Sequence, residues 1–213
     1  MALQGEAFHD PTNIGPRATP QIPNGGTFSI YRATRINAPP QAVYDAILDI
    51  QRWPEWNTFV PSVDITGHPH PHTPRKELCM VAGTNMVFHV QMTKDEMTTS
   101  KETCSHVEPL KSRKERGAKA VTRIRWNLHN AGLFAPSFVV KAERVNEIEE
   151  AEDGTTLYRT WQTFGGMSAS TIRKKYGVAL QERFSDWCRD LKGYAEGKEG
   201  GVVGSQKGTG NAP

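Results

Sequence analysis

The feature that most limits the possible folds of this chain is a long amphipathic segment near its C-terminus, residues 168–196. Its apolar and aromatic residues recur every three or four positions, which is the spacing of one face of an α-helix. These residues are Ile172, Tyr176, Leu180, Phe184, Trp187, Leu191 and Tyr194. A single long helix with such a stripe needs a large apolar surface to cover it, and the rest of the chain must supply that surface.

The region before this helix favours strands. Apolar and polar residues alternate with the period of two that is typical of half-buried strands. The segments with this pattern are 27–37, 86–93, 100–107, 121–129, 138–148 and 156–164, and a shorter one at 62–65 is compatible with a further strand. Pro39 and Pro40 open a short helix, and a second short helix or turn surrounds Pro54. We therefore predict an α+β fold, with two short helices after the first strand and an antiparallel sheet of six to seven strands against the long helix.

Composition changes at both ends of the predicted domain. Residues 1–26 are rich in Pro, Gly, Asn and Thr, and we expect a flexible N-terminal segment. Residues 197–213 form a Gly-rich tail that we expect to be disordered, which leaves one folded domain over residues 27–196. The start of the chain lacks the apolar core of a secretory signal, so we expect a cytoplasmic protein.

Charge and cysteine content argue against several classes of function. The chain has 26 basic and 23 acidic residues, a balance that does not favour nucleic acid as a partner. The 3 cysteines, Cys79, Cys104 and Cys188, are widely spaced and form no zinc-binding pair. No apolar stretch is long enough to span a bilayer. We expect no metal, no nucleic acid and at most transient contact with membranes, and the sequence leaves the oligomeric state open.

Several short motifs in the first half of the chain match a known superfamily. A strand ends at Ala38-Pro39, a helix follows, and Asp49 precedes the sequence Trp53-Pro54-Glu55-Trp56-Asn57. Further on, Gly83-Thr84 precedes a strand, and Gly154-Thr155 and then Phe164-Gly165-Gly166 precede the last helix. Over residues 27–195 the chain resembles the START-like (SRPBCC) superfamily, which includes polyketide cyclase/dehydrase and lipid-transport proteins, coenzyme Q-binding proteins and Bet v 1-like allergens.

The resemblance implies a helix-grip fold, in which a curved antiparallel sheet wraps around the C-terminal helix and a cavity lies between them. It implies binding of a small hydrophobic molecule such as a polyketide, lipid, sterol or quinone, without a cofactor. An alternative is a cofactor-independent polyketide cyclase or dehydratase, which would be a lyase or isomerase. A third hypothesis is a regulatory interaction domain with a filled core. The fold alone does not choose among them.

The residues expected to line such a cavity come from three parts of the chain. The segment after the first short helix, the inward faces of two strands and the inner face of the long helix contribute large side chains with few polar groups. They are Trp53, Trp56, Asn57, Phe59, Met86, Phe88, Met92, Trp126, Tyr176, Leu180 and Phe184. Each is equally compatible with ordinary core packing, and the indoles favour that interpretation.

Only a few polar residues on these elements are candidates for catalysis. A general acid or base must reach the substrate, and we consider Tyr158, Gln162, His129, Arg144 and Tyr176. A structural role is the more common use of each residue type. The alternation of the last strand does not decide whether Tyr158 and Gln162 face inward or outward.

Two polar segments have exposed-loop interpretations. His68, His70 and His72 alternate with prolines, which keep the chain extended and the imidazoles apart, so we expect a solvated loop. The basic stretch 111–119 contains Glu115 and lies between two predicted strands, which is typical of a hairpin loop. The sequence departs from a short member of the superfamily in these two loops and in residues 128–137, and we expect these departures to reshape the cavity mouth.

Overall fold

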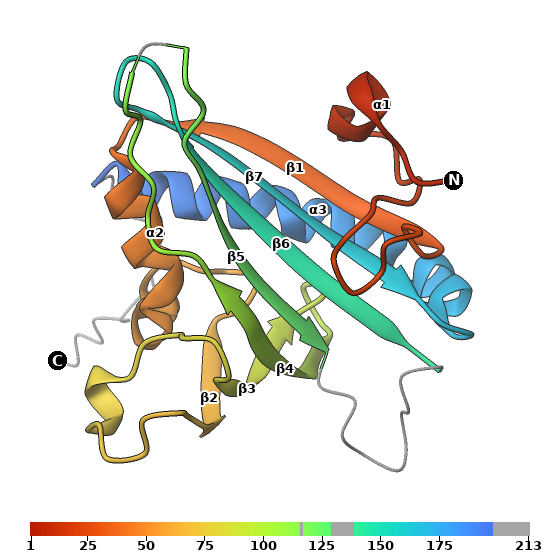
Figure 1. Cartoon of the computed structure of the whole chain (residues 1–213). Helices are drawn as coiled ribbons and strands as arrows, with labels where there is room; N and C mark the ends of the chain where they lie inside the picture. Colours follow the sequence, from red (N-terminus) through yellow and green to blue (C-terminus); the bar gives the residue numbers. More distant parts are fainter. Residues whose placement is uncertain (116, 129–138, 198–213) are drawn as a thin grey trace, which may run out of the picture.

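The computed structural model describes residues 1–115, 117–128 and 139–197. Within these ranges a single sheet of 7 antiparallel strands curves around one long helix (Figure 1). The strands are β1 (Phe28–Ile36), β2 (Ser62–Gly67), β3 (Asn85–Gln91), β4 (Met97–Val107), β5 (Val121–Leu128), β6 (Lys141–Glu150) and β7 (Thr156–Gly165). The helices are α1 (Gly5–His9), α2 (Pro40–Leu48), η1 (Ile50–Glu55), η2 (Arg75–Glu77) and α3 (Ala169–Ala195). The predicted helix-grip architecture is confirmed.

The strand order is β1-β7-β6-β5-β4-β3-β2, so each strand from β2 to β7 lies beside the next one in sequence. The long return from β1 to β2 is made by α2 and η1. The pairing of β4 with β5 shifts register between Cys104 and His106, and that of β2 with β3 shifts between Ile65 and Gly67. Such irregularities increase the local bend and twist of a sheet. The bend gives the sheet a concave inner face.

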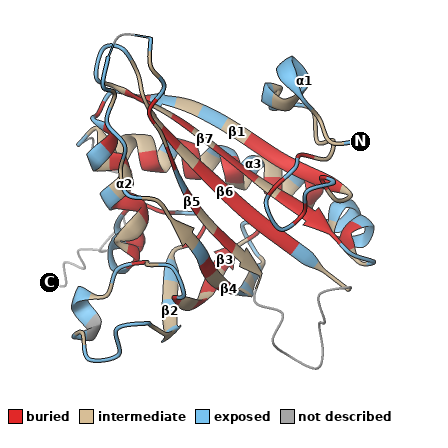
Figure 2. Cartoon of the chain, in the orientation of Figure 1, coloured by how far each residue is buried: buried red, intermediate tan, exposed pale blue. Residues whose placement is uncertain are grey.

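Helix α3 lies along this inner face (Figure 1) and buries the stripe that the sequence indicates. Leu180, Phe184, Trp187 and Leu191 are all buried, and Trp187 is completely covered. Val178, on the opposite side of the helix, is largely exposed. The stripe therefore joins α3 to the sheet, and Figure 2 shows the resulting band of buried positions along the helix.

The start of the chain, where we expect a flexible segment, makes packing contacts with the domain in this structure. Arg17 and Ile22 of residues 1–26 are buried, and Arg17 lies over the ring of Tyr31 on the outer face of the sheet. Ile14 packs against the main core instead. Phe8 packs on an outer cluster formed by Tyr31, Val145 and Trp161. Single side chains make this contact, so no periodic pattern marks it in the sequence. Of the expected tail, residues 197–213, all but Gly197 lie outside the described residues.

None of the described helices combines the length and the apolar composition needed to cross a lipid bilayer.

Candidate functional site

A cavity of about 310 Å³ lies between the concave face of the sheet and α3. Pockets for small molecules typically measure about 300–1,000 Å³. The wall is mainly apolar and contains a few polar groups. It is formed by Phe59, Val60, Phe88, Val90, Met92, Thr98, Thr99, Ser100, Glu102, Trp126, Arg144, Gln162, Phe164, Ile172, Tyr176 and Leu180.

Aromatic side chains fill the neighbouring part of the interior and close it. Trp53 and Trp187 are completely buried, with ring centroids 5.0 Å apart in an edge-to-face arrangement. Trp56 lies 5.3 Å from Trp187, and Trp126 lies 6.2 Å from Trp53. The Trp53 indole donates to the carbonyls of Ala46 and Ile47 at the end of α2. Of these four indoles, only Trp126 lies in the cavity wall.

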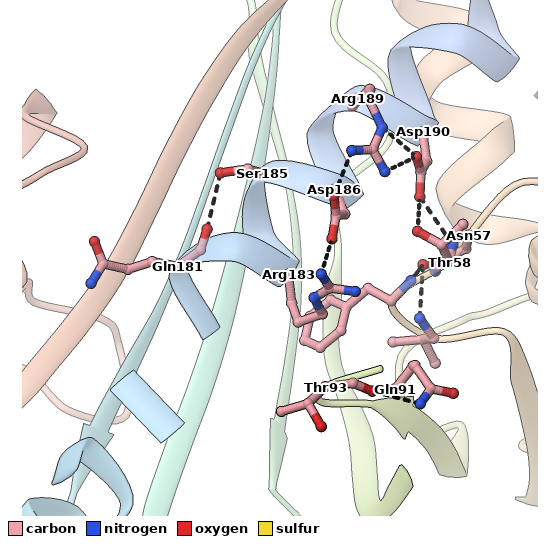
Figure 3. Close-up of polar contacts among 12 residues, drawn as sticks. Asn57, Thr58, Gln91, Thr93, Gln181, Arg183, Ser185, Asp186, Arg189 and Asp190 are labelled. Atoms are coloured by element: carbon pink, nitrogen blue, oxygen red, sulfur yellow. Dashed lines mark hydrogen bonds and ion pairs between the residues drawn. The ribbon is translucent and has the colours of Figure 1, made fainter. Parts of the chain in front are cut away.

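The segment that carries Phe59 and Val60 is fixed to α3 by polar contacts (Figure 3). Asp190 accepts hydrogen bonds from the main-chain N–H of Thr58 at 3.0 Å and from its hydroxyl at 2.5 Å. The Asn57 side-chain oxygen accepts from the N–H groups of Phe59 and Val60. Asn57 is therefore a turn-stabilising residue in this structure, and it positions two neighbours that line the cavity.

The cavity is bordered at one side by the turn between β3 and β4. Glu96, in that turn, accepts a hydrogen bond from the Tyr176 hydroxyl at 2.7 Å and lies 3.2 Å from Lys175 Nζ. Tyr176 and Ile172 are only half-buried, unlike the polar residues deeper in the wall. This turn is thus tied to the first half of α3 where the wall meets the surface.

Arg144 is the buried cation of the cavity wall, at 3% exposure. It lies on β6 between Trp126 of β5 and Gln162 of β7, and all three belong to one row across the inner face. Its guanidinium carbon lies 4.1 Å from the ring centroid of Trp187 and 4.3 Å from that of Phe184. Burial lowers the pKa of Arg144, although a guanidinium remains charged in proteins. Contacts with aromatic faces partly replace the lost hydration.

A hydrogen-bonded network holds one edge of this guanidinium. Arg144 Nε donates to the Thr160 hydroxyl at 3.1 Å. Behind it, the Tyr158 hydroxyl donates to Asn146 at 2.6 Å and accepts from the Trp187 indole at 2.8 Å. Burial raises the pKa of Tyr158, so this phenol stays neutral. Tyr158 is therefore a member of a satisfied structural network and does not line the cavity.

Glu102 is the buried acid of the same wall, at 4% exposure. It lies on β4, and its carboxylate accepts a hydrogen bond from Ser100 at 2.5 Å. Burial raises the pKa of Glu102 to about 7, against the opposing effects of the Ser100 hydrogen bond and the Arg144 charge. A carboxyl with such a pKa can both donate and accept a proton near neutral pH.

The structure brings together some of the residues expected at the site and separates others. Phe59, Phe88, Met92, Trp126, Tyr176 and Leu180 lie in the cavity wall, as do Arg144 and Gln162. Trp53, Trp56, Asn57, Met86 and Phe184 are buried elsewhere in the interior and do not line it. His129 falls outside the described residues. The inward direction of Gln162 resolves the ambiguous alternation of β7, since its outer-face neighbour Trp161 packs with Tyr31.

Glu102 is absent from the residues expected at the site, although a signal for it exists in the sequence. Thr98, Ser100, Glu102 and Cys104 alternate with their neighbours and share the inner face of β4. The polar composition of the strand hides this alternation, because no large apolar residue marks the inward face. Cys104 and Glu102 are both buried, which shows that this set of β4 side chains points to the inner face of the sheet.

The two polar loops have local roles in the structure. His68 Nε2 lies 3.0 Å from the carbonyl oxygen of Cys79, and His68 Nδ1 accepts from the N–H of His70. Both ring nitrogens of His68 therefore have partners within the loop. In the basic loop, Arg113 donates to the main-chain oxygen of Glu150. The described part of this loop connects β4 to β5.

A second hollow of about 570 Å³ lies near the turn at residues 21–27, with Lys141 and Gly165 in its wall. Main-chain atoms and short side chains of a turn form most of it. The described residues of its wall include no buried ionisable side chain, in contrast to the inner cavity. We therefore assign the candidate site to the inner cavity.

Comparison with known sequences gives a family match over the first half of the chain. The model of the family described as polyketide cyclase / dehydrase and lipid transport matches residues 27–114. A protein of Penicillium oxalicum named oxopyrrolidines biosynthesis cluster protein O is 27% identical over 195 residues, covering 85% of this chain and 94% of its own length. These two matches cover longer stretches of the chain than the short motifs on which the resemblance rests.

Solved structures with the same architecture include enzymes and proteins of other kinds. The Zhui aromatase/cyclase of Streptomyces sp. R1128 matches with a TM-score of 0.57 at 12% identity, covering 79% of this chain and 93% of that one. A START superfamily protein of Mycobacterium smegmatis matches with a TM-score of 0.52 at 12% identity, covering 79% of this chain and 97% of that one. At such low identity the likeness concerns the fold alone.

Proposed function

We propose that the chain is a member of the START-like superfamily and that it binds a small hydrophobic molecule in the cavity between the sheet and α3. The observation that carries this proposal is the cavity itself, about 310 Å³ in volume with a largely apolar wall. A filled core, as expected for a purely regulatory interaction domain, would not leave such a space. The volume lies near the lower end of the range for small-molecule pockets, which favours a compact ring system or short chain over a sterol.

The chemistry of the ligand is proposed from the wall and from the relatives. Phe88, Met92 and Leu180 offer apolar and adaptable contact, while Arg144 and Glu102 offer a polar contact at one place. This pattern suits an oxygenated apolar molecule of the polyketide type. The name of the Penicillium oxalicum relative, which refers to oxopyrrolidine biosynthesis, supports a biosynthetic ligand.

Binding is tested with a neutral apolar fluorophore such as N-phenylnaphthylamine, whose emission rises when it leaves water. Val90 lines the cavity, and Val90→Phe adds bulk there. We expect the substitution to weaken binding by about tenfold or more. Val87→Phe is the matched control, because Val87 is on the same strand but on the outer face. Equal effects of the two substitutions, or no saturable binding in the parent protein, would refute the proposal.

A cofactor-independent cyclase or dehydratase is the second candidate, and Glu102 favours it. A carboxyl with a pKa raised to about 7 can remove a proton next to a ketone, while Arg144 stabilises the enolate oxygen that forms. Loss of water from a β-hydroxy ketone would follow when the protonated carboxyl returns its proton to the leaving hydroxyl. NMR can follow deuterium exchange at the carbon beside the carbonyl of a bound ketone. Exchange that persists unchanged in Glu102→Gln would exclude this role.

A further inference from the structure

Two buried ionisable groups in the cavity wall have unused hydrogen-bonding capacity. Among the residues that the structure describes, Nη2 of Arg144 and Oε2 of Glu102 have no hydrogen-bond partner, although both side chains are more than nine-tenths buried. Both residues line the cavity. Buried polar groups in folded proteins nearly always have a partner. This part of the wall is therefore prepared for hydrogen-bonding atoms that the described chain does not provide.

The net charge of the cavity wall depends on the protonation of Glu102. Glu102 is the only acidic residue among the described residues of the wall, and Arg144 the only basic one. When Glu102 is protonated, the wall carries one positive charge among apolar groups. Attraction between opposite charges is strong in such surroundings, and an isolated buried charge is costly. In that state an anion is the partner that would balance the charge of Arg144.

We propose that the ligand carries one delocalised oxyanion and that Arg144 and Glu102 bind it together. The inference rests on the proposed function, since the apolar part of the same molecule fills the cavity. Two oxygens share the negative charge of such a group. One accepts an N–H of Arg144, and the other accepts the O–H of protonated Glu102. A carboxylate fits this description, and so does an ionised cyclic β-diketone.

The way in which Arg144 is held favours a planar anion of single charge. Thr160 accepts from Nε, and the rings of Trp187 and Phe184 lie about the guanidinium at 4.1 Å and 4.3 Å from its central carbon. These contacts fix the plane of the guanidinium group and therefore the directions of its remaining N–H groups. A fixed planar fork matches two oxygens of a planar group. One guanidinium among aromatic rings would leave a doubly charged phosphate incompletely neutralised.

Binding of an anion here is linked to the protonation of Glu102. An ionised Glu102 would repel the ligand, so the bound state favours the protonated carboxyl, whose pKa is about 7 before ligand binds. Arg144 of β6 is the charged group that acts on Glu102 from the facing elements that the structure describes. Tyr158 of β7 and Cys188 of α3 are neutral, since burial raises the pKa of both, and Tyr176 of α3 bonds to Glu96. Beside Glu102, β3 and β5 present Met86 and Leu128.

The test compares three probes of similar chain length: octanoate, an octyl-substituted cyclic β-diketone and octanol. Each displaces the neutral fluorophore, so the affinity of all three is measured in one assay. We expect at least one of the two anions to bind about tenfold tighter than octanol at about pH 6, where both are ionised. Its affinity should fall by up to about tenfold per pH unit above about pH 7, while that of octanol stays constant.

Substitutions test the contributions of Glu102 and Arg144 to anion binding separately. Glu102→Gln should keep the low-pH affinity for the anion across the whole pH range, because the amide donates without titrating. Arg144→Met should lose the preference for the anion over octanol, and Arg144→Lys, which keeps the charge without the fork, should retain part of it. Arg125→Met is the matched control, because Arg125 pairs with Glu143 outside the cavity wall and its loss changes the net charge equally.

The outcomes distinguish failure of this inference from failure of the proposed function. Preference for octanoate alone identifies a carboxylic acid as the ligand class, and preference for the β-diketone alone identifies an enolisable dicarbonyl. Octanol binding as tightly as both anions would overturn the inference but leave the proposed function intact. Retained anion preference in both Arg144 variants would also overturn it. Absence of any fluorophore binding would remove the proposed function as well.

Discussion

The two faces of the sheet each bury an arginine, and the two side chains are held in different ways. On the outer face Arg17 is completely buried, and its Nε, Nη1 and Nη2 all donate to main-chain oxygens of the N-terminal segment. These bonds, to Phe8, Asn13 and Asp10, are 2.7–2.8 Å long. On the inner face Arg144 donates from Nε to Thr160, and its Nη2 has no partner within the described part of the chain. Arg17, whose three side-chain nitrogens all donate hydrogen bonds, holds the N-terminal segment in place. Arg144 retains an N–H group that can donate to a ligand.

The aromatic surroundings sharpen this difference. Arg17 lies over Tyr31 and Phe8 at 5.0 Å and 5.5 Å, and Arg144 has closer contacts with Trp187 and Phe184. Around Arg17 the rings add to a full set of hydrogen bonds. Around Arg144 they substitute for bonds that are missing. A guanidinium that depends on rings for stabilisation can still accept an anion, because ring contacts leave its N–H edge unused.

The largest effect on stability is expected from Arg17→Met. Removing the guanidinium leaves several carbonyls of the N-terminal segment without their donor, and each costs about 1–3 kcal/mol if it stays buried. We expect the free energy of unfolding to fall by about 3–5 kcal/mol, with faster proteolysis within residues 1–26. Urea denaturation and limited proteolysis measure both effects.

Arg35→Met is the control for that experiment. Arg35 lies on the same strand as Tyr31 and forms a surface ion pair with Asp153, both side chains being more than half exposed. Such a pair contributes about 0–1 kcal/mol. If Arg17→Met were no more harmful than Arg35→Met, the N-terminal segment would not be fastened by Arg17 and the comparison of the two arginines would fail.

The fastening by Arg17 also shows what the sequence could not predict. Periodicity predicts α3, because Leu180, Phe184 and Trp187 repeat on one helical face. Periodicity predicts nothing for residues 1–26, because Arg17 donates there to main-chain carbonyl oxygens. Every residue has such an oxygen, so these contacts leave no pattern in the sequence. A lone Arg in a Pro- and Gly-rich segment carries no pattern that distinguishes it from a solvated side chain.

The candidate site was predictable in its faces but not in its extent. Alternation assigns Phe88 and Trp126 to the inner face, and both line the cavity. It cannot say how far along a strand the cavity reaches, so Met86 and Phe88 were indistinguishable, although only Phe88 lies in the wall. That boundary depends on where the Trp53 and Trp187 rings fill the interior, which is a property of packing in three dimensions.

The next largest effect is a pH dependence that belongs to the inner face. The pKa of Glu102 is about 7 in the folded protein and near the ordinary 4.5 when unfolded. The folded state therefore binds more protons between these values, and the stabilisation present at low pH is lost as pH rises towards 7. We expect a loss of up to about 3 kcal/mol between about pH 5 and about pH 8.

Urea midpoints of the parent protein and Glu102→Gln at several pH values measure this loss. The part of the pH dependence that disappears in Glu102→Gln belongs to Glu102. Identical profiles of the two proteins would mean that the carboxyl titrates normally and that the inner face lacks the buried acid described above. Arg17→Met should leave this part of the profile in place, since Arg17 is bound by uncharged carbonyls.

The smallest effect on stability is expected from Arg144→Met in the absence of ligand, although Arg144 is nearly as buried as Arg17. The substitution removes one hydrogen bond to a neutral hydroxyl and the ring contacts, and it also removes a buried charge that has an unpartnered N–H. Replacing buried charges by apolar side chains of similar size is often neutral or stabilising. Methionine is flexible enough to fill the space beside Trp187 and Phe184. We therefore expect the free energy of unfolding to change by less than about 1 kcal/mol, measured by urea denaturation at about pH 6 where Glu102 is protonated. If Arg144→Met lowered the free energy of unfolding as much as Arg17→Met, Arg144 would have a structural role like that of Arg17. Its unpartnered N–H would then be no evidence for ligand binding.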